Sequence, residues 1–186
     1  MMSNLFQDCL GEKFSQLPTL VKQAHTGSSY LSGRASVQHG NLLGRLVCHI
    51  FSMPPARDNS GLTVRGEHSA DVMTWNRHFN DFAMNSHFYK AGSQLVERLG
   101  PIHMAMALDV SEGKLSYRLC KTKLFGLPIP LFLSPKVLAL EWQEARQYCF
   151  SVDVRLPLIG KVLSYQGEMS VENMDDVELN NESLAN

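Results

Sequence analysis

The stretch "MTWNRHFNDFAMNSHF", residues 73–88, alternates apolar and polar side chains on both sides of a central Asn-Asp pair. Alternation with a period of two is typical of a β-strand with one buried face, and Asn and Asp are common turn residues. If Asn80 and Asp81 form a two-residue turn, the register of the two strands is fixed and their apolar residues fall on the same face. The stretch therefore predicts an antiparallel hairpin that packs against a core.

One charged residue, Arg77, lies on the apolar face of this hairpin, between Trp75 and Phe79. The predicted register places Arg77 opposite Met84 and Trp75 opposite Ser86. A buried arginine needs a partner, because an unpaired charge inside a protein costs several kcal/mol. We therefore expect a counter-charge on the same face of a neighbouring strand.

Glu97 is the predicted partner of Arg77. A four-residue loop at 90–93 would pair Phe88 with Leu95 and place Leu95 and Glu97 on the inner face. Two interpretations of the Arg77 and Glu97 pair stay open. The pair is a structural ion pair near a barrel end, or it lines a cavity and holds the carboxylate, phosphate or carbonyl group of an apolar ligand.

A second alternating stretch, "FSVDVRLPLIGKVLSYQG", predicts a hairpin with its turn at 157–160 and with Val152 opposite Tyr165. Further alternating or apolar segments bring the count to about nine strands in sequential antiparallel order. A sheet of that length is expected to curl, because a flat one leaves two edges unpaired. The predicted fold class is α+β, mostly β: an antiparallel meander curled into a barrel or half-barrel, calycin-like or helix-grip-like, with an N-terminal helical segment and one packed helix.

The predicted helices precede most of the predicted strands in the sequence. Residues 5–25 have apolar side chains at helical spacing, with breaks at Gly11 and Pro18. A loop in "GSSYLSG" and a first strand in "GRASV" follow. Asn41 is the predicted N-cap of a helix at 42–52, whose leucine-rich face we expect to pack against the inner face of the sheet or across one end.

The composition favours one ordinary globular domain, with 44% hydrophobic and 19% charged residues in a chain of 186. We expect that domain to span residues 1–170 and an acidic, disordered tail to span 171–186. The formal net charge is -1 and the cations are scattered, so no nucleic-acid surface is indicated. The N-terminus lacks the pattern of a secretory signal, and the longest apolar stretch, 124–133, is too short to span a bilayer. We therefore expect a cytoplasmic protein without stable membrane insertion.

The motifs of common chemistries are absent from the sequence. The four cysteines have no zinc-ligand spacing and are expected to be reduced and mostly buried. The seven histidines also lack ligand spacing, so we interpret them as surface residues and expect no metal site. No phosphate-binding glycine pattern occurs, and the cofactor is unknown. The proline-broken segment 124–135 is expected to be a packed loop over the barrel mouth, or alternatively a lid or lipid-contacting edge over a ligand entrance.

Two tyrosines, Tyr117 and Tyr165, are predicted to point toward the inner face, where a buried hydroxyl needs a partner. Glu141 shares a face with Val137 and Ala139. The other face of that strand is richer in large apolar residues, so Glu141 is predicted to point outward.

The order of several short motifs resembles a known family. The chain contains "GRASVQHGNLLGRLV", "WNRHF", "ERLGP", "GLPIP", "FSVDVRLPLIG" and "YQG" in that order, over residues 5–169. This order is similar to the bacterial domain-of-unknown-function family 4166. The resemblance implies no established activity, but it implies a domain that occurs alone or appended to a saccharopine-dehydrogenase-like dinucleotide-binding domain. Because no such half is present here, a separate dehydrogenase-like chain is a candidate partner. The resemblance places family motif positions at Trp75, Arg77, Phe79, Glu97, Arg98, Gly100, Pro101, Pro128, Pro157, Gly160, Tyr165 and Gly167.

Three functional hypotheses follow. In the first, the barrel binds a small apolar or amphipathic ligand, and an inward Arg/Glu pair fixes its polar end. In the second, the same cavity is an isomerase- or hydrolase-like acid/base enzyme, with Glu97 as proton acceptor, Arg77 as oxyanion stabiliser and Tyr165 as donor. In the third, the domain is structural or binds a partner and has no ligand. The candidate ligand-binding residues are Arg77, Glu97, Trp75, Tyr165, Ser86 and Tyr117.

Overall fold

The computed structural model describes residues 4–69 and 71–173. The helices are α1 (Leu5–Leu10), the 3-10 helix η1 (Gly11–Gln16), α2 (Thr19–Ala24) and α3 (Leu42–Ile50). The strands are β1 (Ser29–His39), β2 (Arg57–His68), β3 (Val72–Phe79), β4 (Phe82–Ala91), β5 (Gln94–Leu99), β6 (Ile102–Ser111), β7 (Lys114–Leu124), β8 (Leu127–Ile129), β9 (Lys136–Glu144), β10 (Gln147–Leu156) and β11 (Gly160–Asn173).

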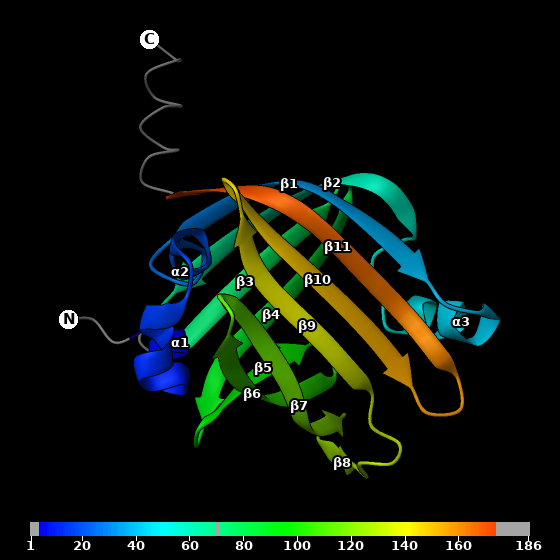
Figure 1. Cartoon of the computed structure of the whole chain (residues 1–186). Coiled ribbons are helices and arrows are strands. Elements are labelled where there is room, and N and C mark those ends of the chain that lie inside the picture. The colour runs from blue at the N-terminus through cyan, green and yellow to red at the C-terminus, as the bar shows by residue number, and fades with distance from the viewer. Residues whose placement is uncertain (1–3, 70, 174–186) are drawn as a thin grey trace.

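Ten of these strands form a closed antiparallel barrel (Figure 1). They follow the order β6-β5-β4-β3-β2-β1-β11-β10-β9-β7, and pairing of β6 with β7 closes the ring. The short strand β8 pairs with β7 outside this ring. The predicted mostly β barrel is thus confirmed, and the described residues contain eleven strands in place of about nine. Closure pairs the edges that an open sheet would expose.

The N-terminal helices cover one end of the barrel, which we term the closed end. The two predicted breaks are confirmed: Gly11 has a φ of 58° after α1, and Pro18 precedes α2. Helix α1 contacts β4, β5 and β6, whereas α2 contacts β1, β9, β10 and β11 on the other side of the ring. The segment therefore bridges the barrel, and it buries the apolar residues Leu5, Phe6, Leu10, Leu17, Val21 and Ala24.

The opposite end carries the connections at 40–56, 80–81, 100–101, 125–135 and 157–159, and we term it the open end. Helix α3 lies there (Figure 1). Asn41 caps it as predicted, since the Asn41 side chain accepts a hydrogen bond from the backbone N–H of Gly44 at 2.9 Å. The expectation for its leucine-rich face was wrong. That face is exposed, and α3 packs on β11 through Gly44 and Cys48.

The close approach of α3 to β11 explains this orientation. A Cβ atom added to Gly44 would lie 2.7 Å from the carbonyl oxygen of Lys161, so only glycine fits there. The Cys48 thiol donates a hydrogen bond of 3.4 Å to the carbonyl oxygen of Val162. Small residues let the helix backbone approach the strand, and this contact turns the bulkier leucines away from the barrel.

The strand registers agree with the predicted hairpins in two of three cases. Phe79 pairs with Phe82 and Arg77 with Met84, as the turn at Asn80 and Asp81 requires. In the C-terminal hairpin Val152 faces Tyr165, also as predicted. The loop at 90–93 was wrong, because β4 and β5 are joined by a tighter turn at Gly92, which has a φ of 62°. Phe88 therefore faces Glu97 in place of Leu95, a shift of two residues that keeps Glu97 on the inner face.

Three other segments differ from expectation or lie outside the described residues. The predicted loop "GSSYLSG" belongs to β1 from Ser29 onward, because Gly33 lets β11 approach so closely that a Cβ there would lie 2.1 Å from the Glu168 carbonyl oxygen. The segment 124–135 contains β8 but carries exposed large apolar residues, so the expectation of a well-packed loop was wrong. Residues 171–173 of the predicted tail belong to β11, and its remainder, 174–186, lies outside the described residues. No helix in the described part of the chain is long and apolar enough to cross a membrane.

Candidate ligand-binding cavity

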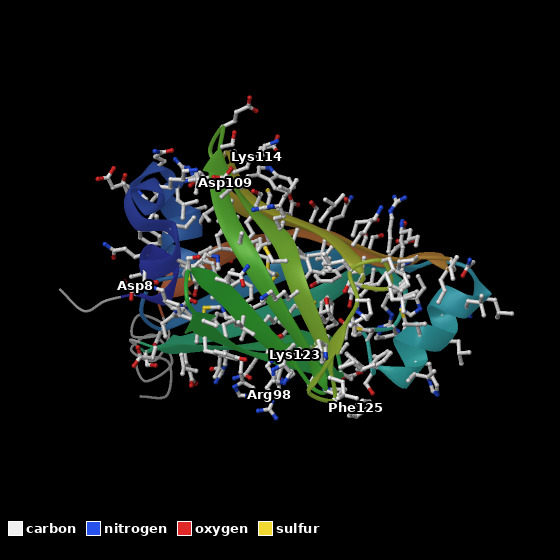
Figure 2. The ribbon with its side chains drawn as sticks, turned by 90° about the horizontal axis from the view of Figure 1, so that it is seen from below. Asp8, Arg98, Asp109, Lys114, Lys123 and Phe125 are labelled. Carbon is white, nitrogen blue, oxygen red and sulfur yellow. The ribbon has the colours of Figure 1, made fainter. Side chains whose placement is uncertain are left out.

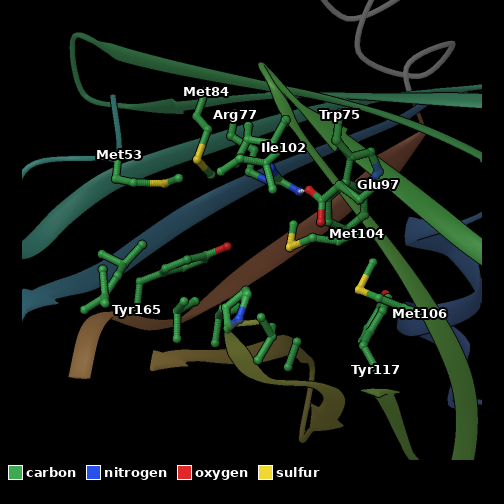
Figure 3. A pocket seen from close by; sticks show the side chains of 18 of the residues that line it. Met53, Trp75, Arg77, Met84, Glu97, Ile102, Met104, Met106, Tyr117 and Tyr165 are labelled. Atoms are coloured by element: carbon green, nitrogen blue, oxygen red, sulfur yellow. Dashed lines mark hydrogen bonds and ion pairs between the residues drawn. The ribbon is translucent and has the colours of Figure 1, made fainter. Parts of the chain in front are cut away.

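The barrel encloses a cavity of about 340 Å³ (Figure 3). Its wall is mostly apolar and includes the side chains of Met53, Met84, Ile102, Met104 and Met106. A cavity of this volume, with an apolar wall and a few polar groups, is typical of small-molecule sites in proteins. The main polar groups form two clusters, and Tyr165 and Thr122 lie outside them.

The first polar cluster joins Arg77, Ser86 and Glu97. The guanidinium group of Arg77 donates from Nη1 to Ser86 Oγ at 2.8 Å and from Nη2 to Glu97 Oε1 at 3.2 Å. Ser86 Oγ in turn donates to Glu97 Oε1 at 2.6 Å. The Arg77 guanidinium also lies 5.3 Å from the ring centroid of Trp75. Burial works against the charge of Arg77, but the neighbouring Glu97 carboxylate raises its pKa further above the ordinary value.

The second polar cluster surrounds Glu141, which was predicted to point outward. That prediction was wrong, since Glu141 is only 6% exposed and lines the cavity. Its Oε2 lies 2.6 Å from His25 Nε2, and its Oε1 accepts a hydrogen bond of 2.5 Å from the Tyr117 hydroxyl. Burial alone would raise the pKa of Glu141, but His25, Tyr117 and Tyr148 hold it below the ordinary value.

The tyrosines of this cluster remain protonated donors. Burial, followed by the nearby Glu141 charge, raises the pKa of both Tyr117 and Tyr148 well above the ordinary value. Tyr117 points inward as predicted, and its partner Glu141 is now identified. The Glu141 carboxylate therefore faces the hydroxyl groups of Tyr117 on β7 and Tyr148 on β10. It also faces the imidazole of His25, which directly follows α2.

His25 is fully buried, so the interpretation of all histidines as surface residues was wrong for it. Its ring stacks between the Phe6 ring, at 3.8 Å between centroids, and the Trp75 ring, at 5.1 Å. Asn4 donates a side-chain hydrogen bond to the His25 carbonyl oxygen. The N-terminal segment thus fixes His25 at the closed end of the cavity, directly behind Glu141.

Tyr165 is a polar residue of the cavity that belongs to neither cluster. It extends from β11, and its hydroxyl points into the cavity (Figure 3). Burial raises its pKa, the charge of Arg77 acts to lower it, and the charges of Glu97 and Glu141 act to raise it. Tyr165 is only partly buried, because its side chain borders the empty space of the cavity. Thr122, which also lines the cavity, has a buried hydroxyl oxygen that lacks a hydrogen-bond partner among the described residues.

The structure brings most of the predicted site residues to one place. Trp75, Arg77, Glu97, Tyr117 and Tyr165 line the cavity, while Ser86 lies behind its wall and supports Arg77 and Glu97. Sequence reasoning missed His25, Glu141 and Tyr148. The inward face of β9 was the available signal, because Val137 and Ala139 share the face of Glu141 and line the cavity with it. Within the described residues, no group of three or more His, Cys, Asp or Glu residues could hold a metal ion, and all four cysteines are free thiols.

His68 should make the stability of the protein depend on pH between 6.5 and 4. Burial, followed by the nearby His25, lowers the pKa of His68 from 6.5 to about 4. The unfolded chain therefore binds a proton first as the pH falls, so the contribution of neutral His68 is complete above 6.5 and is lost toward 4. Urea unfolding at several pH values should show a loss of about 2–3 kcal/mol across this window. In His68→Gln that part of the slope should vanish, and an unchanged slope in the variant would contradict the assignment.

These features define a class of protein: a closed antiparallel β-barrel that is covered by helices at one end and holds a mostly apolar cavity with buried charged clusters. The chain belongs to the family described as Domain of unknown function (DUF4166), whose model matches residues 17–169. The comparisons with curated proteins and with solved structures found no match. The family description carries no activity, and the dehydrogenase-like partner chain stays a prediction.

Proposed function

We propose that the protein binds a small amphipathic molecule inside the barrel, with its hydrocarbon part along the apolar wall and its polar group at Tyr165. The observation that carries this proposal is the Tyr165 hydroxyl, which points into a mostly apolar cavity. A ligand that filled the cavity would displace water from this hydroxyl, so a ligand with a polar group at this position is favoured over one without.

The charges of the cavity favour a neutral polar group. Glu97 already balances the charge of Arg77, and Glu141 is held below its ordinary pKa. A ligand carboxylate or phosphate would bring a further negative charge close to two carboxylates, whereas a hydroxyl or carbonyl group would bring none. We therefore narrow the candidate polar group to a hydroxyl or carbonyl.

Arg77, Glu97 and Tyr165 would also serve the alternative acid/base enzyme, which stays a prediction. Binding is the better supported function, because Glu97 Oε1 already accepts hydrogen bonds from both Arg77 and Ser86. Both donors hold the Glu97 carboxylate in its ion pair with Arg77, as a structural or binding role requires.

Tyr165→Phe provides the sharpest test of the proposal. The change deletes only the hydroxyl, so affinity for 1-decanol should fall about 5- to 10-fold, the equivalent of one hydrogen bond, while the melting temperature stays constant. Isothermal titration calorimetry with 1-decanol and with decanoate at neutral pH measures both the effect and the preference for a neutral group. Tyr30→Phe is the matched control, because Tyr30 is not among the cavity-lining residues.

The purified protein should also be denatured, extracted with organic solvent and searched for released small molecules by mass spectrometry. A released amphipathic molecule would identify the natural ligand class. If neither probe binds and nothing is released, the domain is structural and the proposal fails. If decanoate binds more tightly than 1-decanol, the assignment of a neutral group is wrong.

A further inference from the structure

The exposed apolar side chains of this protein gather at the open end. The described residues include thirteen large hydrophobic residues that are exposed, and only Val72, Leu138 and Leu140 lie outside the connecting segments of that end. Globular proteins seldom expose apolar side chains in such a group unless it forms a contact. Three separate segments supply the others, namely α3, the segment 125–133 and the turn between β10 and β11.

Helix α3 contributes one exposed stripe. Leu42, Leu43, Leu46 and Ile50 are all more than half exposed, and Leu42 reaches 79%. They follow the three-to-four spacing of one helix face. Because Gly44 and Cys48 form the contact with β11, this stripe points away from the barrel wall.

The other two segments contribute exposed tips. Phe125, Leu127, Leu131 and Phe132 are each exposed by 72–75%, and Leu158 by 99%. Figure 2 shows Phe125 beside Lys123 at the end of β7, far from Asp8 and Asp109 at the closed end. The apolar side chains thus sit on separate protrusions around one end of the barrel.

The charge pattern of the open end is positive. None of the segments 40–56, 125–135 and 157–160 contains an Asp or Glu residue. The acidic residues near this end are Asp58, Asp81 and Asp153, and Asp153 is paired with Arg155. The cationic residues near the same end include Arg45, Arg57, Arg98, Lys123, Lys136, Arg155 and Lys161.

We propose that the open end docks on the surface of a lipid bilayer that contains anionic phospholipid. Apolar side chains on separate tips insert among headgroups independently of one another, and the surrounding cations meet the negative surface of the bilayer. This combination fits a fluid interface better than a protein partner, whose surface would have to match several protrusions at once.

The position of the cavity agrees with such docking. The segments that carry the exposed apolar residues also contribute to the cavity wall. Their cavity-lining residues are Val47, Phe51 and Met53, which follow β1, and Leu133, which precedes β9. An apolar molecule that left the cavity at the open end would therefore enter the bilayer without crossing water. This link to the cavity rests on the proposed function, whereas the docking itself rests on the surface residues alone.

Flotation of vesicles tests the docking directly. The wild-type protein should float with phosphatidylcholine vesicles that contain phosphatidylglycerol. Its affinity for vesicles should be about tenfold lower with phosphatidylcholine alone or at high salt. The double variant Phe132→Ser/Leu158→Ser should lose about tenfold in binding, and Lys136→Glu should lose several-fold. Val72→Ser is the matched control and should bind like the wild type, because Val72 is an exposed apolar residue at the closed end.

Several outcomes would overturn the docking proposal. The proposal fails if the wild-type protein does not float with anionic vesicles or binds neutral and anionic vesicles equally. It also fails if the double variant binds vesicles as tightly as the wild type. A dimer in size-exclusion chromatography that the double variant dissociates would assign the surface to a second copy of the chain. Because these residues are exposed, circular dichroism should show that every variant keeps the wild-type melting temperature. The two proposals fail separately, since Tyr165→Phe should keep vesicle binding and Phe132→Ser/Leu158→Ser should keep affinity for 1-decanol.

Discussion

Glu97→Ala should lower the free energy of unfolding by about 3–5 kcal/mol, as expected when one partner of a buried ion pair is removed. The change leaves the guanidinium of Arg77, a residue that is only 7% exposed, without its counter-charge and leaves Ser86 without its acceptor. Urea unfolding followed by tryptophan fluorescence measures the loss. Asp153→Ala is the matched control, because its partner Arg155 has a side chain that is 60% exposed, so the pair should contribute about 1 kcal/mol or less.

A double variant separates the cost of the unpaired charge from the value of the pair. Arg77→Met/Glu97→Leu removes both charges and fills similar volume, so it should recover most of the stability that Glu97→Ala loses. A loss in Glu97→Ala no greater than in the Asp153 control would show that water or an ion reaches Arg77. In that case the Arg77 and Glu97 pair would not be shielded from solvent in the way that its burial indicates.

The inward position of Arg77 was predictable because it depends on local rules. The turn at Asn80 and Asp81 fixes which residues of β3 and β4 face each other, and alternation then assigns Trp75, Arg77 and Phe79 to one side. Even the wrong loop at 90–93 left Glu97 on the inner face, since a shift of two residues preserves the face of a strand.

The second polar cluster was not predictable by the same rules. Glu141 is stabilised inside the barrel by His25, which lies 116 positions earlier in the sequence and arrives there only because the N-terminal segment covers the closed end. Hydrophobicity pointed to the opposite face of β9, where Leu138 is in fact 68% exposed. A partner so distant in sequence leaves no local signal, so the choice of face followed the larger side chains.

The exposed face of α3 shows a limit of periodicity itself. The spacing of Leu42, Leu43 and Leu46 identified an amphipathic helix and its N-cap correctly, but periodicity does not state what covers the apolar face. Here the tight contact at Gly44 decides the orientation. The stripe that would ordinarily be assigned to the core is the surface that we propose to meet a bilayer.

Glu141→Ala should destabilise the fold by about 3–5 kcal/mol, an effect comparable to that of Glu97→Ala. The change removes the shared partner of His25 and of the Tyr117 hydroxyl and leaves both buried. Glu141→Gln keeps the shape and an acceptor for Tyr117, so its loss should be smaller. Urea unfolding of both variants beside the wild type measures the difference, and equal losses would show that charge, and not hydrogen bonding, holds the cluster.

The pH dependence of Glu141 separates it from His68. Because the folded-state pKa of Glu141 lies below its ordinary value of 4.5, the unfolded chain takes up this proton first as the pH falls. The contribution of Glu141 is therefore complete above 4.5 and is lost as the pH falls through the folded-state pKa, below most of the window assigned to His68. Glu141→Gln should flatten the stability curve below 4.5 and leave the slope between 6.5 and 4.5 intact, whereas His68→Gln should do the reverse. If both variants flatten the same region, the titrations of Glu141 and His68 are coupled and cannot be assigned to separate residues. His25, which contacts both residues, would then connect them.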